Sequence, residues 1–399
     1  MLAILGGEPA FCEALHVGRP NIGKRARIAS RLNQILDSRW LTNDGPMVKE
    51  FEARVAEVTG TAHCVAMCNA TVALEIAIRA AELTGEVIVP SYTFIATAHA
   101  LQWQQITPVF ADIDATTHTL EPRAIERMIT PRTSGILATH LWGRAADVAA
   151  LQEIADRRGL TLLFDAAHAF GCSYHGEAIG RFGLAEVFSF HATKFVNSFE
   201  GGAVVTNDEL LARKMRLMRN FGFAGIDRVD YIGTNGKMTE ICAAMGLTSL
   251  EDMPEFVEVN LRNYRAYRDE LTDAPGLALL EYDEGERNNY HYIVVEVDQT
   301  KTGLTRDELV AVLTAENVLA RRYFYPGCHR MEPYRSLFPH AGLVLPVTER
   351  VAERVLVLPT GTAVSDDAAR TICDILRTAI AVAPEIRQAV SRRAMVTST

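Results

Sequence analysis

Residues 187–202 read Val187-Phe188-Ser189-Phe190-His191-Ala192-Thr193-Lys194-Phe195-Val196-Asn197-Ser198-Phe199-Glu200-Gly201-Gly202. The stretch begins as a short apolar strand and continues as a polar loop with a single lysine. A second apolar run, residues 203–206, follows it. Ligands of α/β proteins gather where strands end, so Lys194 occupies a chemically significant position. If burial or neighbouring cations lower its pKa, its amine can form a Schiff base with an aldehyde; the alternative is an ordinary surface lysine.

The composition is that of an ordinary globular protein. The chain has 399 residues, of which 48% are hydrophobic and 22% charged, with a formal net charge of −9. Because no long run of lysine or arginine appears, neither nucleic acid nor an anionic membrane is an expected partner. No apolar run approaches the length of a membrane span, and the N-terminus lacks the basic leader and apolar core of a signal peptide.

The cysteines and histidines predict a reduced compartment and no metal site. Seven cysteines is an odd number, and most of them lie within apolar segments, which indicates a cytoplasmic protein. Cys64 and Cys68 are four residues apart, but no second pair or nearby histidines accompany them, and no HExxH-type pair occurs. We therefore expect no metal.

Short apolar runs alternate with helical patterns in the first half of the chain. Helices are expected over 27–36, 48–59, 70–81 and 93–102, with further helical stretches between the later strands. Short, continuously apolar runs indicate strands buried on both faces, as in a mostly parallel sheet flanked by helices. The expected strands are 63–67, 87–90, 108–112, 135–139, 161–165, 187–190 and 203–206.

The second half predicts a smaller unit. A basic helical stretch from residue 209 and an irregular Gly-rich piece, 222–236, precede one long helix over 238–271. We expect a large domain over residues 1–250, including an N-terminal arm, and a small α+β domain over residues 251–399. That unit has expected strands at 277–282, 290–297 and 318–323, helices at 305–316 and 366–382, and a disordered tail, Arg392–Thr399.

Two strand ends carry groups that suit an anion or a cation. Asn69-Ala70-Thr71 opens a helix, where free N–H groups, the helix dipole and a hydroxyl favour a phosphate; the alternative is a plain N-cap. Asp165 directly follows a buried strand, where a carboxylate is costly unless it meets a cation or donors. A protonated pyridinium nitrogen is such a cation, and a helix-capping aspartate is the alternative. His168 either faces the same pocket or packs.

Two further strand ends complete the set. Phe94 follows the strand at 87–90 and can lie flat on a planar ring or belong to the core. Ser189 and Lys194 offer a hydroxyl and an amine at the stretch quoted first. A phosphate cradle, a stacking aromatic, an aspartate and a lysine are what pyridoxal phosphate requires, because the lysine takes its aldehyde and the aspartate keeps its ring nitrogen protonated.

The sequence resembles the DegT/StrS family of sugar aminotransferases, which are pyridoxal-phosphate enzymes of fold type I. The resemblance extends nearly end to end. It is carried by Trp40-Leu41-Thr42-Asn43-Asp44-Gly45-Pro46, the 188–194 segment, Glu200-Gly201-Gly202 and Val355-Leu356-Val357-Leu358-Pro359. It implies the fold type I architecture, in which a large domain with a mostly parallel mixed sheet is joined to a smaller C-terminal α+β domain.

The resemblance also implies roles for individual residues. Lys194 forms the covalent link to the cofactor and, once freed, moves the proton of the 1,3-shift. Asp165 pairs with the pyridinium nitrogen, His168 lies near the ring hydroxyl and Phe94 stacks on the ring. The cofactor-binding set is Ala70, Thr71, Phe94, Asp165, His168, Ser189, Lys194 and Asn235. Within it, Ala70, Thr71 and Ser189 hold the phosphate.

Residues 233–238 match a family segment that reads Gly-Tyr-Asn-Tyr-Arg-Met. Thr234, Gly236 and Lys237 replace the two tyrosines and the arginine, whereas Asn235 is retained. The family's asparagine reaches the phosphate in the neighbouring subunit, so the resemblance implies a homodimer with shared active sites. The substrate-facing side of the loop differs from the family pattern. Arg219 and Lys237 are weighed as diphosphate contacts but left out of the site.

The reaction implied is a ping-pong transamination from L-glutamate to a nucleotide-linked keto-deoxysugar. We favour amination of dTDP-4-keto-6-deoxy-D-glucose at C4, as in the biosynthesis of natural products such as antibiotics or of surface glycans. A 3-keto-sugar or cyclitol (inosose) aminotransferase of the same family is the nearest alternative. A pyridoxal-phosphate-dependent sugar dehydratase would have histidine in place of Lys194, and a non-enzymatic regulator would have lost Lys194 or Asp165.

Overall fold

Seven strands form the central sheet of the computed structural model, which describes residues 1–397. Their order is β2-β10-β9-β6-β5-β3-β4. β10 runs antiparallel to β2 and β9, and the other four pairings are parallel. The predicted mostly parallel mixed sheet is therefore confirmed. The strands are β2 (His63–Met67), β3 (Glu86–Pro90), β4 (Thr107–Ala111), β5 (Thr133–Thr139), β6 (Thr161–Asp165), β9 (Ala185–Ser189) and β10 (Gly202–Thr206).

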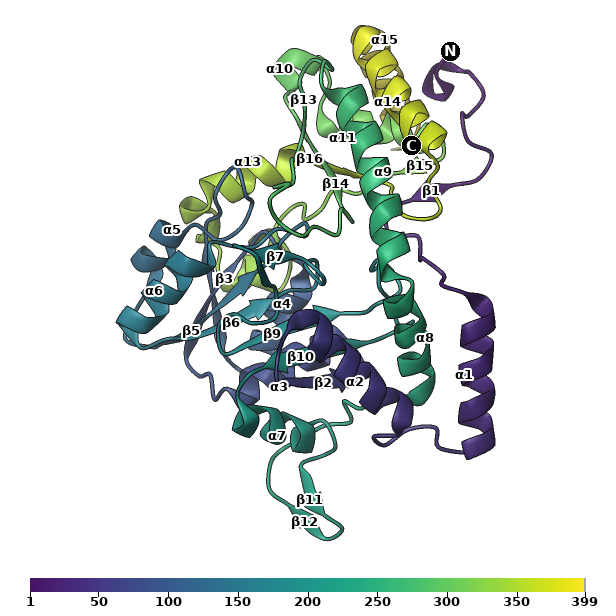
Figure 1. The fold of residues 1–399 in the computed structure, drawn as a ribbon. Helices are drawn as coiled ribbons and strands as arrows, with labels where there is room; N and C mark the ends of the chain where they lie inside the picture. The colour runs from purple at the N-terminus through teal and green to yellow at the C-terminus, as the bar shows by residue number, and fades with distance from the viewer. Residues whose placement is uncertain (398–399) are drawn as a thin grey trace.

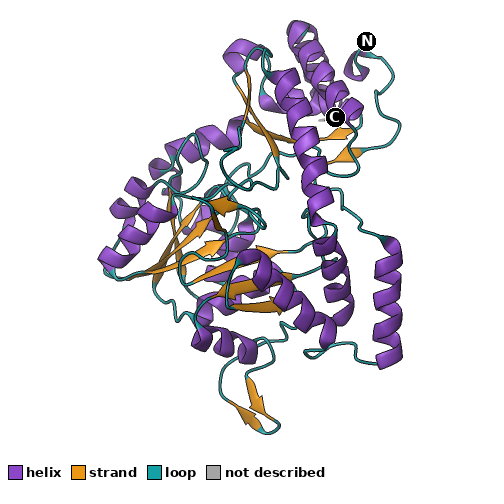
Figure 2. Ribbon diagram, viewed as in Figure 1, coloured by secondary structure: helices purple, strands orange, loops and turns teal. Residues whose placement is uncertain are grey.

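Helices cover both faces of this sheet, which explains why its strands are apolar at successive residues (Figures 1 and 2). Val187 packs with one layer, formed by α3 (Ala70–Ala80), α4 (Ile95–Gln102) and α7 (Glu209–Met218). Phe188 points the other way, toward α2 (Pro46–Thr59) and α8 (Glu240–Glu251). On that second face, α5 (Pro122–Met128) and α6 (Val148–Arg158) cover the neighbouring strands.

The prediction of one long helix over 238–271 is wrong, because this stretch forms two helices. α8 ends at Glu251, and α9 (Met253–Leu271) begins after Asp252. Pro254 lies in the first turn of α9; it lacks an N–H and cannot continue a helical ladder from the turn before. The Asp252 carboxylate accepts the Lys24 N–H at 2.8 Å and so ties the break to the start of α1 (Arg25–Ser38).

The C-terminal unit is built on a second, antiparallel sheet, β13 (Leu277–Leu279), β14 (Ile293–Val297) and β16 (Val355–Leu358). The strand expected over 318–323 shrinks to β15 (Val318–Leu319), which pairs with β1 (Leu15–His16) and not with this sheet. The 3₁₀ turn η1 (Ala3–Leu5) also packs here. The helices that follow α9 in the chain are α10 (Gln299–Thr302), α11 (Arg306–Ala315), α12 (Tyr334–Leu337), α13 (Pro346–Arg354), α14 (Asp366–Ala381) and α15 (Ala383–Thr397), with 3₁₀ turns η2 (Cys328–Arg330) and η3 (Ala341–Val344).

The ends of the chain meet in this second unit. Leu2 and Ile4 are buried in the same apolar cluster as β14 and α14. We propose the division near residue 251 that the sequence predicts, with the first 17 residues of the arm packed on the smaller unit. The expectation of a disordered tail is wrong for residues 392–397, which continue α15; Ser398 and Thr399 lie outside the described residues.

Two hairpins lie outside the sheets. β7 (Ser173–Tyr174) pairs with β8 (Glu177–Ala178), and β11 (Phe223–Gly225) pairs with β12 (Arg228–Val229). The second hairpin projects from the body of the large unit at the bottom of Figure 1 and replaces the irregular piece expected over 222–236. Within residues 1–397, none of the helices combines the length and the apolar character needed to cross a bilayer.

Candidate active site

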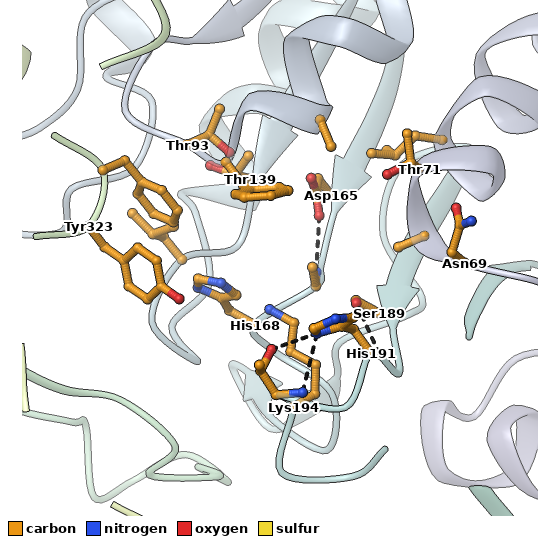
Figure 3. Close-up of a pocket in the computed structure, with 18 of the residues that line it drawn as sticks. Asn69, Thr71, Thr93, Thr139, Asp165, His168, Ser189, His191, Lys194 and Tyr323 are labelled. Carbon is orange, nitrogen blue, oxygen red and sulfur yellow. Dashed lines mark hydrogen bonds between the residues drawn. The ribbon is translucent and has the colours of Figure 1, made fainter. Parts of the chain in front are cut away.

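A cavity of about 350 Å³ opens at the carboxyl ends of β5, β6 and β9 (Figure 3). The starts of α3 and α4 face it, and a C-terminal segment that includes Arg321, Tyr323 and Phe324 completes its wall. Seven of the eight residues predicted to bind a cofactor line it, although they come from four separate stretches of chain. These are Ala70, Thr71, Phe94, Asp165, His168, Ser189 and Lys194.

Lys194 is half-buried, five residues past the end of β9. Burial lowers the pKa of its amine to about 8, and the Asp165 carboxylate opposes this shift. Nζ donates a hydrogen bond of 3.2 Å to Oη of Tyr292. A lysine with a pKa near 8 is partly neutral at physiological pH and is therefore a competent nucleophile and proton acceptor.

Asp165 is the last residue of β6 and is 8% exposed. Its Oδ2 accepts a hydrogen bond from the Thr97 hydroxyl at 2.8 Å, and its Oδ1 accepts the Ala167 N–H at 3.1 Å. Burial nevertheless raises the pKa of this carboxyl, although both hydrogen bonds and Lys194 oppose the shift. A carboxylate in this setting gains most from a cation placed in the cavity.

The start of α3 lines one end of the cavity. The Asn69 side chain caps the helix by accepting the Val72 N–H at 2.9 Å, which leaves the earlier N–H groups of the first turn free for a ligand. Gly202, the first residue of β10, permits this approach: a Cβ there would lie 2.5 Å from the Ala70 nitrogen. Thr71 and Ser189 add hydroxyls from α3 and β9.

His168 belongs to an aromatic cluster at the opposite side of the cavity. It stacks on Tyr292, with ring centroids 4.1 Å apart and planes at 28°. Its Nδ1 accepts a hydrogen bond of 3.4 Å from the main-chain N–H of Trp142, so Nε2 carries the proton of the neutral ring. Burial, together with Lys194 and His291, holds the pKa of His168 well below its usual value. This histidine is a neutral hydrogen-bond donor.

Phe94 and Asn235 have exposed side chains. Phe94 precedes α4 and lines the cavity, and 57% of its surface is exposed, so its ring is available to stack on a planar ligand. Asn235 is exposed outside the cavity of its own chain, where its Oδ1 accepts a hydrogen bond from Lys237 Nζ at 2.6 Å. Its predicted reach into a neighbouring subunit stays a prediction.

The comparisons with known proteins agree on one family. Residues 23–377 match the DegT/DnrJ/EryC1/StrS aminotransferase family. The chain belongs to this family. Over 369 residues it is 35% identical to the dTDP-4-amino-4,6-dideoxy-D-glucose transaminase of Escherichia coli, an alignment that covers 91% of this chain and 98% of that protein.

Two solved structures of aminotransferases are similar to this chain in both fold and sequence. The chain superposes on DesI, crystallised with its TDP-sugar product, with a TM-score of 0.93 and 52% identity, over 98% of this chain and 99% of that one. PseC of Helicobacter pylori, an aminotransferase of pseudaminic-acid biosynthesis, matches with a TM-score of 0.86 and 27% identity, over 92% and 99% of the two chains. The fold is therefore that of the fold type I sugar aminotransferases, and the cofactor is pyridoxal phosphate.

The cavity of this aminotransferase fits that cofactor. Lys194 has an amine that suits the aldehyde, Asp165 has a buried carboxylate that suits a protonated ring nitrogen, and the α3 start has N–H groups that suit the phosphate. Thr139 adds a buried hydroxyl that lines the cavity and has no hydrogen-bond partner in the described part of the chain. Polar atoms left unpaired in a buried wall are expected where a polar ligand binds.

Several residues at the site were missed by reasoning from sequence. Thr139 ends β5 directly beside Asp165 in the sheet, a strand-end position that could have singled it out. Tyr292 and Tyr323 come from the C-terminal unit, and nothing in their local sequence indicates the cavity. Arg219 is buried in ion pairs with Asp44 and Glu52 and so has a structural role.

Proposed function

We propose that this aminotransferase transfers the amino group of L-glutamate to C4 of dTDP-4-keto-6-deoxy-D-glucose. The observation that carries the proposal is the 52% identity, over 98% of the chain, to DesI, whose crystal structure was analysed in the presence of its TDP-sugar product. The Escherichia coli relative is named for the 4-amino-4,6-dideoxyglucose nucleotide. We place the enzyme in the cytoplasm, in the biosynthesis of deoxyaminosugars for natural products such as antibiotics or for surface glycans.

Lys194 is proposed as the catalytic residue of this reaction. Pyridoxal phosphate supplies an aldehyde that condenses with amines and a ring that accepts the electron pair left on carbon when a proton departs. The Lys194 amine, with its pKa lowered to about 8, would hold the aldehyde of the cofactor. Its Nζ, when not bound, would take a proton from one carbon and return it to another.

The other predicted site residues are proposed to orient the cofactor. Asp165 would hold the ring nitrogen and favour its protonated form, and His168, whose Nδ1 already accepts a hydrogen bond, would donate from Nε2 to the ring hydroxyl. Phe94 would cover one face of the ring. The first-turn N–H groups of Ala70 and Thr71, with the hydroxyls of Thr71 and Ser189, would hold the phosphate.

We further propose a homodimer in which Asn235 reaches the phosphate of the partner's site. The support is local: Asn235 and the hairpin β11–β12 are exposed, and apolar side chains gather beside them. Phe221, Phe223, Ile226 and Ile232 are 42% to 94% exposed. An apolar group of this size on a projecting element is typical of a protein–protein contact.

Purified protein incubated with L-glutamate and a panel of nucleotide keto-sugars tests the function. We expect conversion of dTDP-4-keto-6-deoxy-D-glucose, with the new amine located on C4 by NMR. Amination of a 3-keto-sugar or an inosose in its place would overturn the assigned substrate but keep the aminotransferase. Elimination of water from the sugar without amine transfer would identify a dehydratase.

A further inference from the structure

Tyr292 contacts the side-chain amine of Lys194. Its Oη accepts the 3.2 Å hydrogen bond from Nζ, and Nζ lies 5.9 Å from the centroid of its ring. Within residues 1–397 this is the only side-chain hydrogen bond made by Nζ. Tyr292 directly precedes β14, so the contact joins the C-terminal unit to the strand-end loop of the large unit.

The Tyr292 side chain is held firmly. It is 5% exposed, stacks on His168 and meets the Trp142 ring edge-on at 5.5 Å and 64°. Its main chain is fixed by Tyr282, whose hydroxyl lies 2.9 Å from the Tyr292 carbonyl oxygen and accepts the Tyr292 N–H at 3.3 Å. The phenolic oxygen therefore has one position relative to Lys194, and little conformational entropy is lost when it binds the amine.

The residues before Tyr292 attach the same segment to the site. Asn289 is 1% exposed and donates from Nδ2 to the carbonyl oxygen of His168 at 2.9 Å. His291 donates from Nε2 to the carbonyl oxygen of Thr193 at 3.0 Å. Residues 289–292 thus contact His168, Thr193 and Lys194 in turn, so the segment is part of the built site and not a loop that merely passes by.

We propose that Tyr292 is a positioning residue for Lys194, whose free amine it holds within the cavity by accepting a hydrogen bond at its phenolic oxygen. This inference rests on the proposed role of Lys194. The amine must leave the cofactor while substrate is bound and still stand within reach of two carbon atoms, so a fixed partner keeps it in a productive orientation. Burial raises the pKa of the Tyr292 phenol well above 10, so Tyr292 keeps its own proton and Lys194 carries the one that moves.

The effect of the Tyr292 hydroxyl on the pKa of Lys194 depends on the other titratable groups nearby. Asp165 favours the charged amine, while His168 and His291 are neutral because burial and Lys194 lower their pKa values, that of His291 to about 3. Against this background the Tyr292 hydroxyl is a neutral acceptor, which binds an ammonium more strongly than an amine. Its removal must therefore lower the pKa of Lys194 further.

The test compares Tyr292→Phe with Tyr290→Phe. Both changes remove one phenolic oxygen from the same segment, but the Tyr290 ring packs on Tyr264 and Tyr282. In cofactor-free protein, the rate of reductive methylation of Lys194 is followed from pH 6 to pH 10 by mass spectrometry of its peptide. We expect the pKa of Lys194 to fall by about one unit in Tyr292→Phe and to stay unchanged in Tyr290→Phe, since a hydrogen bond to a charged group is worth that much.

With cofactor bound, kcat should fall about tenfold in Tyr292→Phe while KM for the nucleotide sugar stays within about twofold. Identical Lys194 titrations in the parent and Tyr292→Phe, or equal shifts in both variants, would overturn the inference. If Tyr292→Phe does not fold, 3-fluorotyrosine at position 292, a weaker acceptor of nearly the same shape, must shift the titration the same way. The titration needs no sugar, so a wrong substrate assignment would not affect it.

Discussion

At the residue scale, burial acts on Lys194 and Asp165 in the same way: it favours the neutral form of each. It lowers the pKa of Lys194 to about 8 and raises that of Asp165, although the hydrogen bonds from Thr97 and Ala167 keep an acceptor in place for a cation. The protein bears the cost of desolvating both groups before any cofactor arrives. In the proposed site, a protonated ring nitrogen opposite Asp165 would offset part of this desolvation cost when the cofactor binds.

The first prediction concerns Lys194→Met in cofactor-free protein. Lys194 has a lower pKa when folded than its usual 10.5, so the unfolded chain binds more protons between about pH 8 and 10.5 and the parent gains stability as pH rises through that window. The variant lacks the buried charge, and its free energy of unfolding should exceed that of the parent by on the order of 2 kcal/mol at pH 7.

Chemical denaturation at several pH values measures this difference, which should shrink as pH approaches 10. Lys301→Met, a change at a lysine whose side chain is 69% exposed, serves as the control and should alter stability little at any pH. A difference that grows with pH would contradict the prediction. The same Lys194→Met protein should lose at least about a thousandfold in turnover of amino donor, and borohydride should no longer fix the cofactor to the chain.

The second prediction is that Asp165→Asn folds normally but turns over slowly. The amide has nearly the same shape and can still meet Thr97 and the Ala167 N–H, so the melting temperature should change little. Without a carboxylate the ring nitrogen loses its partner, and kcat should fall by about a hundredfold or more. Asp156→Asn, at an exposed helical position, is the matched control. Wild-type kcat in Asp165→Asn would show that the carboxylate does not serve the reaction.

At the scale of elements, the site depends on how closely β10 approaches the start of α3. Gly202 pairs with Met67 of β2 and Ser189 of β9, and it lies against the backbone of Asn69 and Ala70. The start of α3 and the end of β9, which precedes Lys194, are therefore fixed to each other through one residue without a side chain. Glycine is needed here for space, as its neighbours are backbone atoms that cannot move independently.

The third prediction follows from that contact. In Gly202→Ala the new methyl group meets the Ala70 nitrogen and the Asn69 carbonyl carbon, both 2.5 Å from the ideal Cβ position. The free energy of unfolding should fall by about 3 kcal/mol, and the dissociation constant for pyridoxal phosphate, measured by fluorescence, should rise at least about tenfold. Gly225→Ala, where the nearest atom lies 4.0 Å away, should leave both unchanged. If Gly202→Ala bound pyridoxal phosphate as tightly as the parent, the proposed phosphate site at the start of α3 would be wrong.

At the scale of the whole molecule, segments far apart in sequence build one unit of structure. The N-terminal turn packs on the C-terminal helices, and the C-terminal unit supplies Tyr292, Tyr323 and Phe324 to a site whose lysine lies in the large unit. The hairpin β11–β12 points away from this body (Figure 1). In the proposed dimer, its neighbour Asn235 completes the partner's site.

The fourth prediction tests the shared site by mixing two variants. Lys194→Ala should be inactive, and Asn235→Ala should lose most of its activity because the phosphate loses a donor. If the two proteins are unfolded and refolded together, half the dimers are mixed and one of their two sites is intact. Activity should therefore recover to about a quarter of the parental value. No recovery, while each variant alone still forms dimers, would show that each site is built from a single chain.

The central sheet and the lysine-bearing stretch could be read from the sequence because they depend on local patterns. β3, β9 and β10 are buried at every position, so their sequences are mostly apolar without the alternation of a one-sided strand, and ligands of such sheets gather at strand ends. That reasoning placed Lys194, Asp165 and Thr71 around one cavity. The same reasoning wrongly predicted one helix over 238–271, because it overlooked Pro254, a local signal of a helix break within an otherwise unbroken helical pattern.

What the sequence by itself determined was therefore the large sheet and the family, and it singled out strand-end residues that line one cavity, because burial periodicity and short motifs act over a few neighbouring residues. Only the tertiary structure decided the partner of Lys194. Tyr292 is 98 residues away in the chain, and its hydroxyl reaches Nζ because β14, His168 and Trp142 are packed together. Contacts of this kind depend on the sum of many packing interactions, which no local pattern encodes.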